Sequence, residues 1–466
     1  MDKNIKDLGI YELNRLYREK ALSPVETVSA LFEEIEAGKK LNAFITTTPE
    51  QALIDARESE ARFMKGTPLG PLDGIPYAVK DIFYTANVKT TMASKVYEDF
   101  TPDYNASVID RLADGGAILM GKTNTHEFAC NPMADLSHFG PCRNPYNPEH
   151  SACGSSGGSG AAVAAKMLPV TLGSDTAGSV RIPAAACGVV GMRPTQGLVS
   201  RHGVFPLSYS IDNVGPITRS VLDNAMMLNG MVGYDPRDSL SFSAPAMDYT
   251  SSIENGSLNG LVFAVPEDLG TSNPVDPEIK AAFDEVLQIL WSQGASIRHI
   301  PSLDPDGKYE RACRTLRLAD AYVVHKKGME DHEDIYTPEI YNQMQGGKGV
   351  KAEEYISADR ERLEFRLLVN ELFNKVDIII TPTLPVLAPR IGTRTITVAG
   401  KDYTSTSMLT CITVLASFTG YPAITIPCGL SKSGLPIGVQ LCSARLNELG
   451  AYKAAFALEK AIGFKP

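Results

Sequence analysis

The sequence predicts an α/β fold with a largely parallel or mixed β-sheet. From about Gly74 onward, short apolar runs typical of buried strands alternate with segments whose apolar residues recur at helical spacing. The chain is also long enough, at 466 residues with 44% hydrophobic residues, to bury a substantial core. Strands that alternate with helices favour a parallel or mixed sheet covered by those helices.

The N-terminal part of the chain, about residues 1–65, has the pattern of helices. Ser23 is an expected N-cap, Pro24 suits the first helical position, and Glu26 completes a capping box. Apolar residues then follow at helical spacing. Thr48 and Pro49 provide the same kind of start for a second helix.

Seven short apolar runs are the expected strands of the sheet. They are Tyr77–Val79, Ala117–Met120, Pro169–Leu172, Leu261–Val265, Val376–Ile380, Ala423–Ile426 and Ile437–Leu441. The clearest helix among them begins at Asp276-Pro277-Glu278. Its apolar face carries Ile279, Phe283, Val286, Leu287 and Leu290.

A polar stretch over residues 235–260 is the best candidate for a linker. The rhythm of strands and helices continues on both sides of it, so we interpret it as a long surface connection. We therefore expect one domain over residues 1–466, with a helical segment at about 1–65 and a core at about 66–460.

Charge and composition exclude several classes of partner. With 44 Lys and Arg against 54 Asp and Glu the formal net charge is −10, which argues against nucleic acid or an anionic membrane. The sequence has no run of 18 apolar residues and no apolar signal-peptide centre. Its eight cysteines form no CxxC pair, and its seven histidines lack metal-ligand spacing. We expect a cytoplasmic protein without a metal or other cofactor.

Two short motifs have the form of known sites but lie in the wrong context. Residues 116–123 match the phosphate-binding pattern G-x-x-x-x-G-K-[ST], yet the four residues between the glycines are apolar and are expected to form a strand. Residues 154–158 match G-x-S-x-G, the nucleophile elbow of α/β-hydrolases. That elbow follows a strand, whereas residues 144–151 contain two prolines and two asparagines and favour a loop.

Three other segments together suggest a chemical site. They are residues 74–81, which end an apolar run with Lys80, the Gly/Ser-rich residues 154–164, and residues 173–183. Taken singly, a lysine at a strand end is usually solvated and a Gly/Ser run is usually a loop. Together they offer an amine, hydroxyl groups and a cluster of backbone N–H donors, which are the groups that acyl transfer requires.

Residues 154–183 closely resemble the signature of the amidase signature family. The surroundings of Lys80 and the segments 140–145, 191–197, 381–385, 420–429 and 434–440 also fit that family, so the resemblance covers roughly residues 20–460. It implies a single domain built on a mixed sheet wrapped by helices. Cys153 departs from the pattern, because the family usually has glycine there, and we expect it to pack rather than to act in redox chemistry.

By motif, the resemblance implies a Ser–cis-Ser–Lys triad. Ser179 would be the nucleophile, Ser155 the bridging serine with a cis peptide bond, and Lys80 the base. A base must be neutral, so the pKa of Lys80 must fall from about 10.4 by roughly three units, which burial at an apolar strand end can supply.

The resemblance also implies roles for neighbouring residues. The backbone N–H groups of Thr176, Ala177, Gly178 and Ser179 would form an oxyanion hole. Ser156 would hydrogen-bond to Lys80, while Asp175 and Arg181 would hold the loop. Substrate would contact Ala129, Cys130, Asn131 and Met133. The rest of the site would be walled by residues 321–357 and 402–414, whose tyrosines and methionines either bind an apolar group or pack the core.

Two functions fit this resemblance. The first is a stand-alone serine amidase that hydrolyses a small-molecule carboxamide, aryl amide or carbamate-like bond through an acyl-enzyme on Ser179. The alternative is the glutaminase subunit of a tRNA-dependent amidotransferase, which works with partner subunits. The segments 199–203 and 210–212 resemble that subunit, whereas residues 331–355 resemble the stand-alone enzymes. Homodimers are common among similar proteins.

Overall fold

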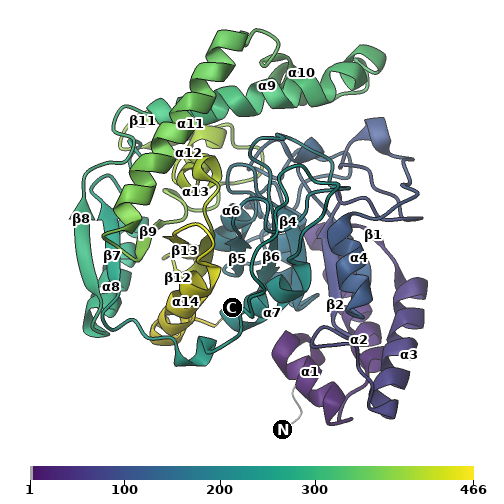
Figure 1. Ribbon diagram of the computed structural model, residues 1–466. Helices are drawn as coiled ribbons and strands as arrows, with labels where there is room; N and C mark the ends of the chain where they lie inside the picture. The colour runs from purple at the N-terminus through teal and green to yellow at the C-terminus, as the bar shows by residue number, and fades with distance from the viewer. Residues whose placement is uncertain (1–3, 466) are drawn as a thin grey trace.

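A computed structural model describes residues 4–465, and its centre is one mixed sheet of eleven strands. Figure 1 shows the sheet enclosed by helices. In spatial order the strands are β1 (Phe44–Thr47), β3 (Ile118–Thr123), β2 (Pro76–Lys80), β4 (Val170–Ser174), β6 (Val214–Thr218), β5 (Val190–Arg193), β12 (Ala423–Leu430), β13 (Pro436–Ser443), β9 (Ile378–Pro382), β7 (Val262–Pro266) and β8 (Ser296–Ile300). A separate hairpin joins β10 (Thr395–Val398) to β11 (Lys401–Thr404). The predicted α/β class is confirmed.

The direction of the strands changes across the sheet. Strand β2 is parallel to both of its neighbours, β3 and β4, and β7 is parallel to β8 and β9. The strands between β4 and β9 pair antiparallel. Because parallel strands end at the same edge of a sheet, the ends of β2, β3 and β4 lie together. All seven expected strands are present, each shifted by no more than two residues at its start.

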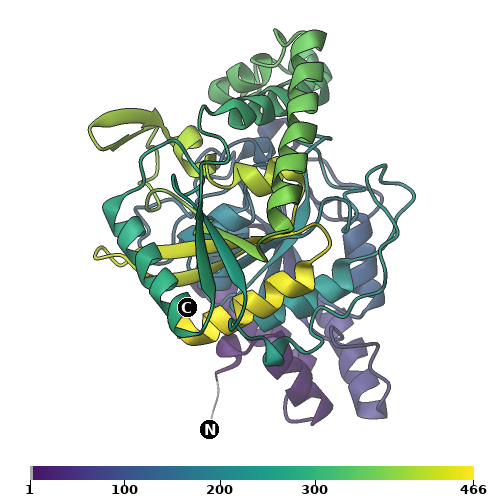
Figure 2. The same cartoon turned by 60° about the vertical axis from the view of Figure 1, so that its left-hand side comes forward.

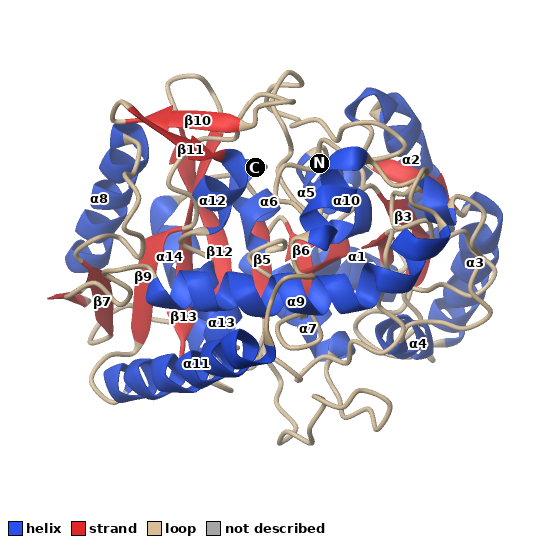
Figure 3. Cartoon of the chain, turned by 90° about the horizontal axis from the view of Figure 1, so that it is seen from above, coloured by secondary structure: helices blue, strands red, loops and turns tan. Residues whose placement is uncertain are grey.

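The helices form layers around the sheet. They are α1 (Ile10–Arg18), α2 (Pro24–Ala37), α3 (Pro49–Lys65), α4 (Ser107–Asp114), α5 (Gly157–Ala164), α6 (Arg181–Ala186), α7 (Val221–Met231), α8 (Pro277–Ser292), α9 (Lys308–Asp331), α10 (Pro338–Gln345), α11 (Ala352–Phe373), α12 (Ser405–Thr410), α13 (Val414–Thr419) and α14 (Glu448–Ile462). Helices α9, α10 and α11 gather at one end of the molecule in both side views (Figures 1 and 2). Seen from that end, α9 runs across the middle of the sheet (Figure 3).

The start signals identified in the sequence begin helices in the structure. The capping box at Ser23 opens α2, Pro49 opens α3, and Asp276 caps α8. The N-terminal segment is not entirely helical, however. Its four-residue strand β1 pairs with β3 and forms the edge of the sheet, because a short extended segment can extend a sheet without any strong sequence pattern of its own.

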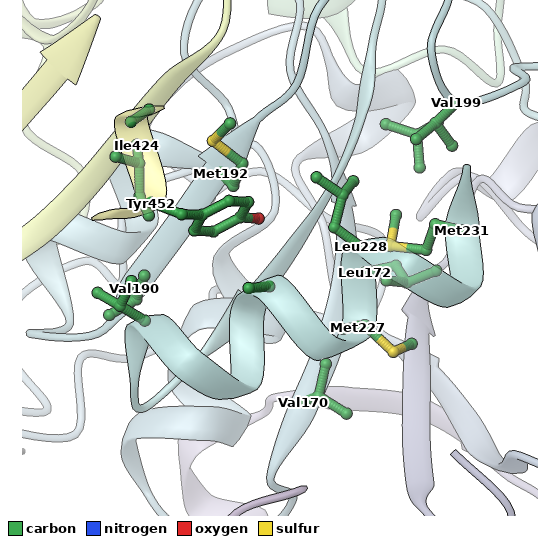
Figure 4. Packing of buried hydrophobic residues seen from close by; sticks show 14 of the residues in the cluster. Val170, Leu172, Val190, Met192, Val199, Met227, Leu228, Met231, Ile424 and Tyr452 are labelled. Carbon is green, nitrogen blue, oxygen red and sulfur yellow. The ribbon is translucent and has the colours of Figure 1, made fainter. Parts of the chain in front are cut away.

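Alternating side chains divide the core between the two faces of the sheet. In β2, Tyr77 and Val79 belong to one buried cluster and Ala78 to another, as expected for a strand that is buried on both faces. Figure 4 shows the first cluster, where Met227, Leu228 and Met231 of α7 lie near Val170 and Leu172 of β4, with Tyr452 of α14 close by. Small residues of α5 and α6 pack on the opposite face.

The two rejected motifs are structural elements of other kinds. Residues 118–123 of the phosphate-loop pattern are the buried strand β3, as expected, and Gly115 caps α4. No strand leads into residues 154–158. Residues 235–260 are irregular except for one 3₁₀ turn, and buried Tyr249 and Ile253 hold them against the core. Within residues 4–465, no helix combines the length and hydrophobicity that crossing a membrane requires.

Candidate active site

Lys80 lies at the end of β2 and is completely buried. Its amino group donates to the Ser155 hydroxyl at 2.6 Å and to the Ser174 hydroxyl at 2.9 Å. Because β4 runs parallel to β2 beside it, Ser174 at the end of β4 lies next to Lys80. No ion pair joins Lys80 to any described residue, so both of its partners are neutral hydroxyls.

Burial lowers the pKa of Lys80 to about 7, although the more distant charges of Asp212 and Asp175 oppose this shift. Removing an ammonium from water disfavours its charged form, and two hydroxyls compensate less than a carboxylate would. Lys80 is therefore partly neutral near pH 7, as a base must be.

The loop that carries Ser155 forms hydrogen bonds with both the segment of Lys80 and the segment of Ser179. The peptide bond between Gly154 and Ser155 is cis, as predicted. The Ser155 carbonyl accepts from the Thr125 hydroxyl at 2.9 Å and the His126 N–H at 3.2 Å. One residue further on, the Ser156 N–H donates to the carbonyl of Ser179 at 3.3 Å, which brings the two serine loops together.

The prediction that Ser156 hydrogen-bonds to Lys80 was wrong. The Ser156 hydroxyl donates to the Ser174 carbonyl at 3.3 Å, and the Ser174 hydroxyl takes the expected place beside Lys80. Ser156 precedes the first turn of α5, so its side chain points toward the adjacent strand end instead of Lys80. The position of Ser174 at the end of a strand parallel to β2 was the signal that could have identified it.

Ser179 lies in a tight loop between β4 and α6 that Asp175 organises. The Asp175 carboxylate accepts from the N–H groups of Gly178 at 2.9 Å and Val180 at 3.3 Å. It also pairs with two buried guanidinium groups, those of Arg181 and Arg193, at 3.0 Å each. Burial alone would raise the pKa of Asp175, but these arginines outweigh burial and hold it well below its usual range. Asp175 and Arg181 thus hold the loop, as expected, and Arg193 was missed.

Three N–H groups of this loop have no acceptor among the described residues: those of Thr176, Ala177 and Ser179. Each of these three residues keeps a small exposed fraction, between 4 and 8%. The N–H of Gly178, which was expected to join them, is instead occupied by Asp175. An oxyanion could therefore be held by three of the four predicted donors.

Gly178 permits this arrangement through its backbone. Its φ of +120° is a conformation that residues with side chains rarely adopt. A Cβ atom there would also lie 2.4 Å from the Thr413 hydroxyl oxygen, which donates to the Ala177 carbonyl at 2.5 Å. The glycine lets α13 approach the loop and fix the orientation of its free N–H groups.

The comparisons with known proteins agree with this geometry. The family model described as Amidase matches residues 26–449. The chain belongs to the amidase signature family. It is accordingly an enzyme that hydrolyses C–N bonds by serine-based chemistry.

Individual relatives cover nearly the whole chain. A glutamyl-tRNA(Gln) amidotransferase subunit from Geobacter sp. (strain M21) is 35% identical over 98% of this chain and 97% of its own length. A solved chain from a vestigial protein complex that bears on the origins of an s-triazine catabolic enzyme is 32% identical, with a TM-score of 0.92, and covers 98% of this chain and 99% of its own. A structure described as an amidase is 30% identical, with a TM-score of 0.88 over 97% of this chain and 99% of its own.

The loop at residues 129–133 of this amidase signature enzyme lies against the helices above the site. The Cys130 carbonyl accepts from the Gln343 amide of α10 at 2.8 Å, and the Asn131 amide donates to the Thr406 hydroxyl of α12 at 3.0 Å. Ala129 lines a cavity together with Ser174 and Thr176. Met133 was predicted to contact substrate. It packs instead with Cys153 in a buried apolar cluster.

Two cavities lie on either side of the loop that carries Ser179. The first, of about 270 Å³, contains Ala129, Ser174 and Thr176 in its wall. The second, of about 320 Å³, lies beneath α9 and borders Ala177. Its walls include eight charged, amide or hydroxyl side chains: Glu310, Arg314, Arg317, Gln343, Thr404, Thr406, Ser407 and Thr410.

The tyrosines and methionines of the predicted wall segments pack the core. Tyr336, Met344 and Met408 are at most 4% exposed and belong to buried clusters. Both wall segments do border the second cavity, but with polar side chains such as Gln343 and Thr406. Cys153 is buried, and burial raises its thiol pKa to about 12, which agrees with a packing role.

Proposed function

We propose that this enzyme hydrolyses the amide bond of a small polar carboxamide through an acyl-enzyme on Ser179. The observation that carries the proposal is the buried Lys80, whose pKa is about 7 and which lies 2.6 Å from the Ser155 hydroxyl. A neutral amine in that place can accept the Ser155 proton, while Ser155 accepts the proton of Ser179. Ser179 then attacks the amide carbonyl carbon.

The oxygen of the attacked carbonyl becomes negatively charged as the new C–O bond forms. The free N–H groups of Thr176, Ala177 and Ser179 would bind this oxyanion, each contributing roughly 3 kcal/mol to the stability of the transition state. The amide C–N bond then breaks, and Ser155 returns a proton to the leaving amine. Water, deprotonated by the same relay, cleaves the ester on Ser179 and restores the enzyme.

The size and polarity of the second cavity support a small polar substrate. Its volume of about 320 Å³ and its hydroxyl, amide and guanidinium groups suit an amide of amino-acid size better than an aryl amide. Glutamine is the first candidate, because the amidotransferase relative that is 35% identical covers nearly the whole chain.

The second candidate function follows from that relative. We propose that, if glutamine is the substrate, the chain acts as the ammonia-releasing component of an amidotransferase complex with a partner subunit. The similarity to a chain from a vestigial protein complex also favours a partner. The structural neighbour described simply as an amidase supports the stand-alone alternative, in which a homodimer would suffice.

Release of ammonia or amine from substrates of the purified protein tests both candidates. Glutamine and a panel of aliphatic amides, aryl amides and carbamates would be offered to wild type, to Ser179→Ala and to Ser292→Ala, a surface serine on α8 that serves as the control. We expect turnover by wild type and Ser292→Ala and none by Ser179→Ala. Turnover that survives in Ser179→Ala would contradict the proposal. Activity on glutamine that requires a co-purified partner would favour the amidotransferase function.

A further inference from the structure

Arg317 of α9 is an unpaired cation in the wall of the second cavity. It lines that cavity together with Ala177 of the oxyanion loop. No hydrogen bond or ion pair joins its guanidinium group to any residue between 4 and 465, although the side chain is only partly exposed. A guanidinium removed from water without hydrogen-bond acceptors destabilises a protein, so this residue calls for an explanation.

Other shielded arginines of the molecule have acceptors within the chain. Some donate to backbone carbonyls, as Arg219 and Arg366 do, and others pair with carboxylates. Arg181 and Arg193 pair with Asp175, and Arg62 pairs with Asp73 at 2.7 Å. Burial lowers the pKa of Arg317, yet an arginine in a protein keeps its charge near neutral pH. A guanidinium of this kind favours an anion supplied from outside the chain.

The groups that surround Arg317 do not provide that anion. Apart from burial itself, the strongest influences on the pKa of Arg317 are the Cys313 and Cys130 thiols. Burial raises the pKa of both thiols, so they stay neutral. Arg314 and Glu310, which also line the cavity, act more weakly and in opposite directions. Two guanidinium groups against one carboxylate leave the cavity positively charged.

We propose that Arg317 binds a carboxylate of the substrate, so that the enzyme prefers amides of acidic molecules. A guanidinium offers two parallel N–H donors that match the two oxygens of a carboxylate. The cavity that Arg317 lines also borders Ala177, so an anion held there would place the rest of a small molecule toward the loop of Ser179. This inference rests on the proposed function, and Gln343, Thr406 and Thr410 would bind the substrate's remaining polar groups.

A matched pair of substrates tests this role. Glutaric acid monoamide carries a carboxylate, and glutaric diamide is its neutral analogue of the same chain length. For Arg317→Met we expect KM for the monoamide to rise about 10-fold to 100-fold, with kcat changed less than about 3-fold and the kinetics of the diamide unchanged. Arg317→Lys should recover part of the affinity. Arg360→Met, an exposed site on α11, removes the same charge and should change neither substrate.

Equal losses for both substrates in Arg317→Met would overturn the inference and indicate a structural role. Wild-type turnover of the neutral diamide with no preference for the monoamide would also overturn it, while leaving the proposed amide hydrolysis intact. Glutarate binding measured by calorimetry tests the anion site independently of amide hydrolysis. The comparison is between Ser179→Ala and the Ser179→Ala/Arg317→Met double variant. If glutarate binding depends on Arg317 while the wild-type protein cleaves no amide, the anion site is supported and the proposed function is contradicted.

Discussion

Two buried lysines at neighbouring strand ends have very different surroundings. Lys80 ends β2, and Lys122 lies one residue before the end of the adjacent parallel strand β3; neither side chain is exposed. Lys122 forms an ion pair with Asp81 at 3.4 Å and donates to the Phe83 carbonyl and the Thr90 hydroxyl. Within residues 4–465, the Lys80 amino group donates hydrogen bonds only to the hydroxyls of two serines.

The difference shows how one fold can bury a structural cation beside a base. Burial lowers the pKa of both amines, to about 8 for Lys122 and to about 7 for Lys80. The carboxylate of Asp81 opposes the shift at Lys122 directly, whereas only more distant carboxylates oppose it at Lys80. A paired lysine stabilises its surroundings as a cation, and an unpaired lysine is free to exchange a proton.

The largest expected effect is that of Lys80→Met. Removing the base should lower kcat by about 10³-fold, within the usual range for general bases. Because the pKa of Lys80 is lower in the folded than in the unfolded protein, protonated Lys80 destabilises the fold below pH 7 and this cost declines as the pH rises toward 10. The variant should therefore be at least as stable as wild type at pH 7 in a thermal unfolding measurement. A large loss of stability would show that Lys80 has a structural role instead.

Lys122→Met should have the opposite outcome. The substitution removes the partner of Asp81, whose Oδ1 has no hydrogen bond among the described residues. A buried carboxylate left unpaired typically destabilises a protein by about 3–5 kcal/mol. We expect unfolding at clearly lower denaturant concentration, with kcat of the folded fraction within about 5-fold of wild type. If kcat falls as far as in Lys80→Met, the distinction between the two lysines is wrong.

The pH dependence of the reaction gives a third test of this distinction. Protonated Lys80 cannot accept a proton, so kcat/KM on a neutral amide should rise about tenfold per pH unit below 7 and become constant above it. Glu459 is a matched control, because burial raises its pKa to about 7 as well, in a hydrogen bond to the Val221 N–H. Glu459→Gln should leave the profile unchanged. A profile that rises only near pH 10 would mean that Lys80 is not the base.

The sequence predicted much of the fold and of the site because both depend on local patterns. The strand ending at Lys80 and the Gly/Ser-rich loop of Ser155 were identified from consecutive residues, and the structure brings them into hydrogen-bonding contact. Six strands escaped prediction: β1, β5, β6 and β8 of the sheet and both strands of the β10–β11 hairpin. Strand β1 is only four residues long and β8 is largely exposed, so neither has a strong pattern of its own. Their positions depend on pairing with other strands more than on their own residues.

What the sequence could not supply was the choice between equivalent groups. Ser156 and Ser174 both carry a hydroxyl and both lie far from Lys80 in the chain, and only the parallel pairing of β2 with β4 selects Ser174. Likewise Gly178 offers the same backbone N–H as its neighbours, but the folded loop directs it to Asp175. No sequence motif marks Arg317. That its guanidinium group lacks a partner within the described residues can be seen only in the folded structure, where α9 lies over the loop.

The smallest expected effect is that of Ser174→Ala, which sharpens the comparison at Lys80 itself. The Ser174 hydroxyl accepts a hydrogen bond from the Lys80 amine at 2.9 Å and so stabilises the protonated form. Its loss should lower the pKa of Lys80, shifting the rise of kcat/KM to lower pH by about one unit or less. Since Lys80 also becomes less well positioned, kcat should fall about 10-fold at most. If the rise of kcat/KM shifts to higher pH instead, Ser174 stabilises the neutral form of Lys80 and not the protonated form.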